Sequence, residues 1–261
     1  MPKRLSTRDP DFERAFSALL SEKREVSDDV DMAVAEIIAD VRARGDAALI
    51  ELSRRFDSID LAATGIRVTA AEVDTAVDQC SKETLAALEL ARDRIADHHE
   101  RQRPADGRYR DPIGVELGHR WTAVESAGLY VPGGLASYPS SVLMNAVPAR
   151  VAGVPRIVIV VPSPGGELNP LVLAAARLAG VEEIYRIGGA QAVAALAYGT
   201  ATVRPVVKIV GPGNAWVAAA KRRVFGTVGI DSIAGPSEVL IIADRHNDPE
   251  VLAADLLAQA E

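Results

Sequence analysis

Hydrophobic positions along the chain follow two different periods. Between residue 10 and about residue 103 they recur every three to four positions, the spacing of helices that bury one face. This spacing predicts helices over residues 11–22, 30–41, 46–56, 70–79 and 82–95. Gly45 separates the second helix from the third, and Thr69 and Ser81 are expected to cap the last two. The polar stretch 101–111 is predicted to be a connection.

From residue 115 onward, short continuous apolar runs alternate with segments of helical length that are rich in small residues. Strands are predicted over residues 126–131, 157–161, 183–187, 206–210, 228–231 and 239–243. Continuous apolar runs are typical of strands that are buried on both faces. The alternation of strand and helix therefore predicts an α/β fold with a mostly parallel sheet and flanking helices.

Four of these strands run into turns that contain glycine. The turns lie at residues 132–134, 188–191, 211–214 and 234–238. Glycine allows positive φ and leaves room for a ligand against the backbone. The helix start that follows such a turn is expected to offer unpaired N–H groups to an anion. Turns at the same ends of neighbouring strands favour a nucleotide or a phosphorylated metabolite as the ligand.

Individual residues in these turns allow two interpretations each. Asn214 could cap a helix or contact a cofactor, and Trp216 stands where the dinucleotide fingerprint has its third glycine. Gln191 could be a solvated first-turn residue or a ligand contact. Tyr130 ends a strand, where it could pack or stack on a nucleotide ring. Ser237 could brace the next strand, and no His or Lys close by in sequence suggests a serine nucleophile.

Composition and charge exclude several classes of protein. A formal net charge of −7 argues against nucleic acid as a partner. No apolar run approaches the roughly 20 residues of a membrane span, and the N-terminus does not resemble a secretory signal, so a cytoplasmic protein without a membrane partner is expected. Cys80 is the only cysteine, which excludes an intrachain disulfide, and the histidines lack chelating spacing. The basic residues 221–223 are expected to complement the C-terminus of their helix.

Together, the ordered blocks of this chain resemble the histidinol dehydrogenase family. The similarity extends over essentially the whole chain and is carried by residues 45–49, 54–57, 128–134, 138–145, 188–192, 211–214, 229–231, 234–238 and 255–261. The resemblance implies a zinc-containing homodimer with incomplete Rossmann-like domains. Such an enzyme oxidises L-histidinol through histidinaldehyde to L-histidine with two NAD⁺, as the last step of histidine biosynthesis.

The resemblance also implies roles for particular residues. Tyr130, Gln191 and Asn214 match positions that contact NAD. Ser237 matches a substrate contact, and Gln259 matches a residue that binds both substrate and zinc. The corresponding domain division is a helical region at 1–110 that contributes to the first domain, a Rossmann-like NAD-binding domain at 111–238, and a return toward the first domain at 239–261.

The last helix, predicted over residues 250–261, stops at Glu261 without a glycine or a basic last turn. We therefore expect a longer protein, with a zinc-binding histidine and a catalytic glutamate–histidine pair beyond residue 261, as the resemblance implies. The chain alone is expected to be inactive. Two alternatives remain open: a thiol-dependent aldehyde dehydrogenase that uses Cys80, and a non-catalytic nucleotide-binding or assembly module.

Overall fold

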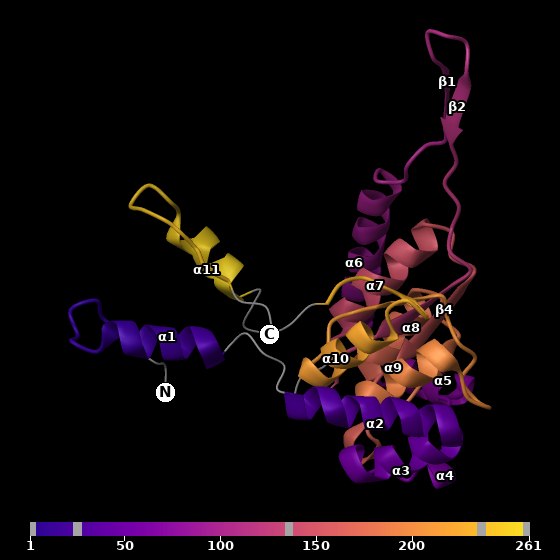
Figure 1. The fold of residues 1–261 in the computed structure, drawn as a ribbon. Coiled ribbons are helices and arrows are strands. Elements are labelled where there is room, and N and C mark those ends of the chain that lie inside the picture. The colour runs from indigo at the N-terminus through magenta and orange to yellow at the C-terminus, as the bar shows by residue number, and fades with distance from the viewer. Residues whose placement is uncertain (1–3, 23–27, 134–137, 234–238, 258–261) are drawn as a thin grey trace.

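The computed structural model describes residues 4–22, 28–133, 138–233 and 239–257. A five-stranded parallel sheet in the order β5-β4-β3-β6-β7 forms its centre (Figure 1). The strands are β3 (Ser126–Tyr130), β4 (Arg156–Val160), β5 (Glu183–Tyr185), β6 (Lys208–Val210) and β7 (Gly229–Ile230). The prediction of an α/β fold is confirmed, and five of the six predicted strands overlap these strands.

The order of the strands reverses at the centre of the sheet. The chain runs outward from β3 through β4 to β5 and then returns to place β6 on the other side of β3. Gly128 of β3 pairs with Val158 on one side and Ile209 on the other. In open parallel sheets, ligands bind beyond the carboxyl ends of the strands at such a reversal. The topology therefore directs attention to the turns after β3 and β6.

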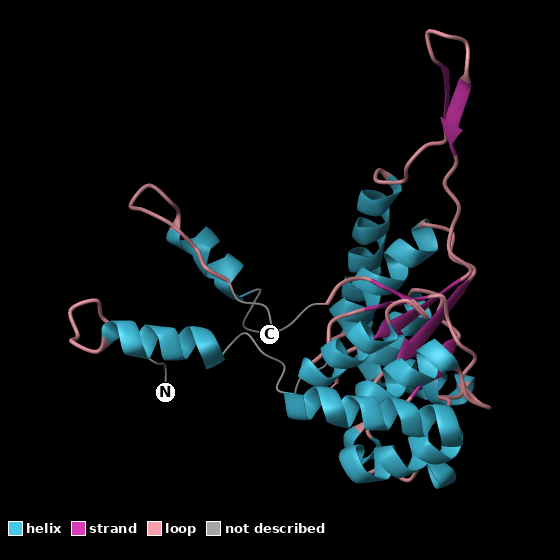
Figure 2. Cartoon of the chain, in the orientation of Figure 1, coloured by secondary structure: helices cyan, strands magenta, loops and turns pink. Residues whose placement is uncertain are grey.

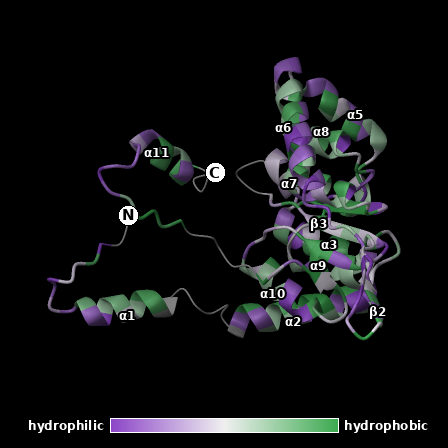
Figure 3. Ribbon diagram, turned by 90° about the horizontal axis from the view of Figure 1, so that it is seen from above, coloured by the Kyte–Doolittle hydropathy of each residue, from purple (hydrophilic) through white to green (hydrophobic). Residues whose placement is uncertain are grey.

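Helices cover both faces of the sheet. On one face lie α2 (Asp28–Arg44), α3 (Asp46–Asp57), α9 (Gly189–Tyr198) and α10 (Ala215–Val224). On the other face lie α5 (Ala70–Gln79), α6 (Lys82–Glu100), α7 (Pro139–Val151) and α8 (Pro170–Leu178). Figure 3 shows hydrophobic positions concentrated around β3 and α9, and many hydrophilic positions on outer helices such as α6. The helices predicted between residues 30 and 95 thus pack on the same sheet as the later ones.

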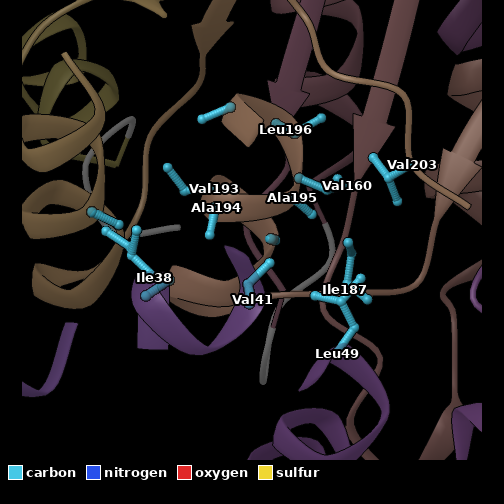
Figure 4. Packing of buried hydrophobic residues seen from close by; sticks show 14 of the residues in the cluster. Ile38, Val41, Leu49, Val160, Ile187, Val193, Ala194, Ala195, Leu196 and Val203 are labelled. Carbon is cyan, nitrogen blue, oxygen red and sulfur yellow. The ribbon is translucent and has the colours of Figure 1, made fainter. Parts of the chain in front are cut away.

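The most deeply buried helix is α9, in which every residue from Ala190 to Ala197 is buried. Val193 and Leu196 pack in one cluster with Ile38 and Val41 of α2 and with Val160 of β4 (Figure 4). A helix that is apolar all round must be enclosed on every side. The small side chains of α9 let α2, α10 and the sheet enclose it.

Several local sequence signals act as predicted. Thr69 and Glu72 form a capping box at the start of α5, and the Ser81 hydroxyl accepts a hydrogen bond from the Thr84 N–H at the start of α6. Gly45, which ends α2 and precedes α3, has φ +58°, a conformation that glycine adopts without strain. These caps fix where the helices on both faces begin.

Two expectations about local structure are wrong. The polar stretch after α6 is not only a connection, because Gly107–Arg110 (β1) pairs in an antiparallel hairpin with Glu116–His119 (β2). This hairpin stands clear of the sheet (Figure 2), so neither of its faces needs the apolar residues that would have marked it. Residues 239–243, predicted as a strand, form none, since they pair with no other strand in the described ranges.

Four shorter or peripheral helices complete the described residues. They are α1 (Phe12–Glu22), α4 (Leu61–Thr64), the 3₁₀ turn η1 (Pro164–Gly166) and α11 (Pro249–Leu257). In Figure 1, α1 and α11 lie apart from the sheet and its covering helices. Within the described ranges, no helix combines the length and the apolar character that a bilayer crossing requires.

Candidate functional site

A cavity of about 380 Å³ opens beyond the carboxyl ends of β3, β4, β5 and β6. Each of these strands contributes through the turn that follows it, and α2 and α3 supply the remaining wall. The lining residues are Ile37, Phe56, Asp57, Tyr130, Gly133, Pro162, Pro164, Gly189, Ala190, Gln191, Asn214 and Trp216. Three residues that the sequence marked as ambiguous, Tyr130, Gln191 and Asn214, therefore meet in one place.

Tyr130 is the last residue of β3 and is only 3% exposed. Its hydroxyl oxygen accepts a hydrogen bond of 3.0 Å from the backbone N–H of Gly189, the first residue of α9. Burial raises the pKa of Tyr130 to about 12, and the negative charge of Asp57 acts in the same direction. The phenol therefore stays neutral at physiological pH and keeps its own proton for donation.

Gln191 lies in the first turn of α9 and is 2% exposed, so the reading as a solvated residue is wrong. The glycines before it permit this position. A Cβ on Gly188 would lie 2.6 Å from the Pro162 ring, and a Cβ on Gly189 would lie 2.8 Å from the Gln191 Oε1 atom. The contact at Gly188 is with a rigid ring, and Gly189 has φ +62°, a conformation that glycine adopts without strain, so the turn favours glycine at both positions.

Asn214 performs one of its two predicted roles and is placed for the other. Its Oδ1 atom accepts hydrogen bonds of 3.1 Å from the N–H groups of Trp216 and Val217, which makes it the N-cap of α10. The same residue lines the cavity. Because capping uses only the oxygen of the amide, the Nδ2 group remains a donor for a ligand.

The expectation that the helix starts offer unpaired N–H groups is only partly right. The Gly189 N–H is bound to Tyr130, and two N–H groups of α10 are bound to the Asn214 side chain. Among the described residues, the N–H groups of Ala190 and Gln191 have no acceptor. Side chains of the protein have taken the other positions, so an anion would meet fewer free donors than the sequence predicted.

Comparisons with known proteins identify the family of this chain. The profile of the histidinol dehydrogenase family matches residues 20–261. The chain belongs to the histidinol dehydrogenase family. It is 72% identical over 253 residues to "Histidinol dehydrogenase" of Brucella abortus (strain 2308), which covers 97% of this chain and 59% of that protein. It is 69% identical over 261 residues to the protein of that name from Rhizobium meliloti (strain 1021), which covers all of this chain and 60% of that protein.

A solved structure gives the same result. The crystal structure of histidinol dehydrogenase from Elizabethkingia anophelis superposes with a TM-score of 0.84 at 38% identity, over 90% of this chain and 55% of that one. The resemblance inferred from the motifs is thereby confirmed. The chain spans about three fifths of the length of the curated relatives that it matches.

The histidinol dehydrogenase fold here contains a buried lysine that sequence reasoning did not place. Lys221 of α10 is 3% exposed and donates a hydrogen bond of 3.0 Å to the carbonyl oxygen of Gly211. It also forms an ion pair with Asp231, whose other oxygen accepts a bond of 2.8 Å from the Gly211 N–H. The backbone N–H and C=O of Gly211 are therefore both hydrogen-bonded, which fixes the turn between β6 and α10.

The electrostatics of Asp231 reflect the same network. Burial raises the pKa of this carboxyl, but hydrogen bonds from Lys221, Ser232 and Gly211 together outweigh it and leave the pKa below its ordinary value. The other two basic residues, Arg222 and Arg223, bind Asp31 on α2. The basic cluster thus ties α10 to its neighbours, beyond the role at its helix end that the sequence suggested.

Asp57 lines the cavity, and sequence reasoning did not mark it as a site residue. It is the last residue of α3 and is half-buried, and its Oδ2 atom is buried without a hydrogen-bond partner. Burial raises the pKa of this carboxyl. An acidic residue at a helix C-terminus is electrostatically unfavourable, and this was the available signal that it serves another purpose.

The remaining predicted residues divide into two groups. Ser237 and Gln259 lie outside the described residues. Cys80 follows α5, which packs on the face of the sheet opposite to α9, and burial raises the pKa of its thiol. It does not line the cavity, and the family that matches is histidinol dehydrogenase, so neither observation supports the alternative of a thiol-dependent aldehyde dehydrogenase. Over the described ranges, no three His, Cys, Asp or Glu side chains converge as metal ligands would.

Proposed function

We propose that this chain forms the NAD-binding part of an enzyme that oxidises L-histidinol through histidinaldehyde to L-histidine, the last step of histidine biosynthesis. The observation that carries the proposal is the convergence of Tyr130, Gln191 and Asn214 in one cavity at the strand reversal of a histidinol dehydrogenase fold. A homodimer, a cytoplasmic location and zinc as a second cofactor belong to the same proposal.

The cavity fits part of a dinucleotide in size and chemistry. Its volume of about 380 Å³ lies within the range of small-molecule sites. The Asn214 amide and the free N–H groups of Ala190 and Gln191 are donors for phosphate oxygens. The neutral Tyr130 hydroxyl adds a further donor. When bound, the nicotinamide supplies the hydride acceptor, and the protein groups orient it.

The proposed reaction also needs a zinc site and proton acceptors. The described residues hold no cluster of three or more His, Cys, Asp or Glu side chains that could bind a metal. Ser237 as a substrate contact and Gln259 as a ligand of substrate and zinc remain predictions, as do the domain boundaries after residues 110 and 238. General acid–base catalysis contributes about 10²–10⁴-fold to a rate, so turnover of substrate requires aligned proton acceptors in addition to the cavity.

Calorimetry with the 261-residue chain tests the proposal. We expect NAD⁺ to bind, and replacement of the buried Gln191 by leucine to weaken binding by about tenfold, since a polar contact is lost. Replacement of the exposed Gln79 by leucine makes the same chemical change outside the cavity and should leave affinity unchanged. Absence of NAD⁺ binding by the wild-type chain, or equal affinities of the two variants, would refute the assignment of the cavity.

A further inference from the structure

Asp57 lies in the cavity as an acceptor without a donor. Its Oδ2 atom is one of the buried side-chain atoms without a hydrogen-bond partner in the described part of the chain, and among them it is the one that belongs to a cavity-lining residue. A buried carboxylate oxygen without a donor is costly, so natural proteins rarely retain one without a purpose. The position therefore suggests that a donor arrives from outside the protein.

The chemistry of the cavity narrows the identity of that donor. None of the described residues that line the cavity is Lys or Arg. An anionic group beside Asp57 would meet a negative charge with no cation to compensate it. Donor groups without a negative charge suit the position instead, and among them the two hydroxyls of a vicinal diol match the two acceptor oxygens of a carboxylate. In a dinucleotide, the riboses carry vicinal diols.

We propose that the Asp57 carboxylate accepts hydrogen bonds from a ribose diol of the dinucleotide and thereby excludes a cofactor that carries a 2′-phosphate. This inference rests on the proposed function, because it names the cofactor class of the same cavity. Standard dinucleotide folds place an acidic residue for this purpose after the second strand of the sheet. Here the carboxylate comes from α3, a helix that precedes the sheet in sequence.

Calorimetric titrations of the 261-residue chain with NAD⁺ and NADP⁺ test the inference. For the wild-type chain we expect NAD⁺ to bind more tightly than NADP⁺, by on the order of a hundredfold. Asp57→Asn should reduce this preference by about tenfold or more, because repulsion of the phosphate is lost, while NAD⁺ itself binds somewhat more weakly. Asp78→Asn, which makes the same change at an exposed position of α5, should keep the wild-type preference.

Further measurements distinguish failure of the Asp57 inference from failure of the proposed function. Asp57→Ala, which also lacks the carboxylate, should reduce the preference in the same way, and thermal unfolding followed by circular dichroism verifies that both variants fold. An unchanged preference in variants that still bind NAD⁺ overturns the role of Asp57 and leaves the proposed function intact. Failure of the wild-type chain to bind either dinucleotide overturns both.

A last arm tests which donor Asp57 binds. Nicotinamide hypoxanthine dinucleotide lacks the adenine amine but keeps both riboses, so we expect it to bind the wild-type chain and Asp57→Asn in the same proportion as NAD⁺ does. A selective loss of affinity for this analogue in the wild-type chain alone would assign the carboxylate to the adenine amine and overturn the inference.

Discussion

Replacement of Gly211 by alanine tests how closely the turn after β6 is built against β3. Gly211 has φ +115°, and an added Cβ would lie 2.2 Å from the carbonyl oxygen of Tyr130 and 3.1 Å from its nitrogen. The turn cannot swing away cheaply, because Lys221 and Asp231 hold both polar groups of the Gly211 peptide. Backbone strain at this φ costs about 1–3 kcal/mol and the forced contact another 1–3, so we expect a loss of about 2–6 kcal/mol in the free energy of unfolding.

A second glycine supplies the control. Gly226, just after α10, has φ +99°, and no neighbouring atom lies within 4 Å of a built Cβ. Gly226→Ala should therefore show only the strain, about 1–3 kcal/mol. Urea unfolding followed by circular dichroism measures both variants, and the difference between them is the cost of the contact with Tyr130. Equal losses would refute the close approach of the turn to β3.

Substitutions at three other positions give distinct expected outcomes. Asn214→Ala should lower the free energy of unfolding by about 1 kcal/mol through loss of the cap, whereas Asn214→Asp keeps the cap and should weaken only NAD⁺ binding, by calorimetry, through its charge. Lys221→Met should destabilise by about 2–3 kcal/mol in urea, less than for a fully buried pair because the Asp231 side chain is 33% exposed. Since the pKa of Asp231 is depressed in the folded state, the loss of stability in Lys221→Met should be full at pH 7 and shrink as acid protonates the Asp231 carboxyl. Lys82→Met, at an exposed position, is the control. A loss of stability that does not depend on pH would contradict the ion pair. Asp57→Asn should stabilise the chain by about 1 kcal/mol at pH 7. Because folding raises the pKa of Asp57, this gain should vanish below the ordinary value of 3.8, grow as the pH rises from there to the folded-state pKa, and stay constant above it. A gain already present in acid would contradict the assignment.

The centre of the fold was predictable because its signals are local. A strand buried on both faces must be a continuous apolar run, and β4 is such a run, with four of its five residues buried. Parallel strands bring their carboxyl ends to one edge of the sheet, so Tyr130, Gln191 and Asn214, each at or just after such an end, were bound to gather. The hairpin of β1 and β2 gave no comparable signal, because both of its strands are almost wholly exposed.

The parts that could not be predicted depend on packing between distant elements. The sequence places Asp57 at the end of an amphipathic helix, and only the way α3 packs brings its carboxyl into the cavity. The sequence likewise shows Lys221 as one of three adjacent basic residues. Its burial follows from the side of α10 that faces the Gly211 turn, while its two neighbours face α2. A difference of one position along a helix rotates a side chain by about 100°, and this separates a buried cation from an exposed one.

The cavity depends on both halves of the chain. The turns after β3 to β6 supply most of its lining, but Ile37, Phe56 and Asp57 come from helices that precede the sheet. These helices are integral to the core, since α2 packs against α9 and α10 in one hydrophobic cluster and Asp31 binds the arginines of α10. A polypeptide that began after residue 110 would expose part of α9, whose residues from Ala190 to Ala197 are all buried, and would lose the one carboxylate among the described residues of the cavity. The helices before the sheet therefore both enclose the core and supply the charge on which discrimination between cofactors would depend.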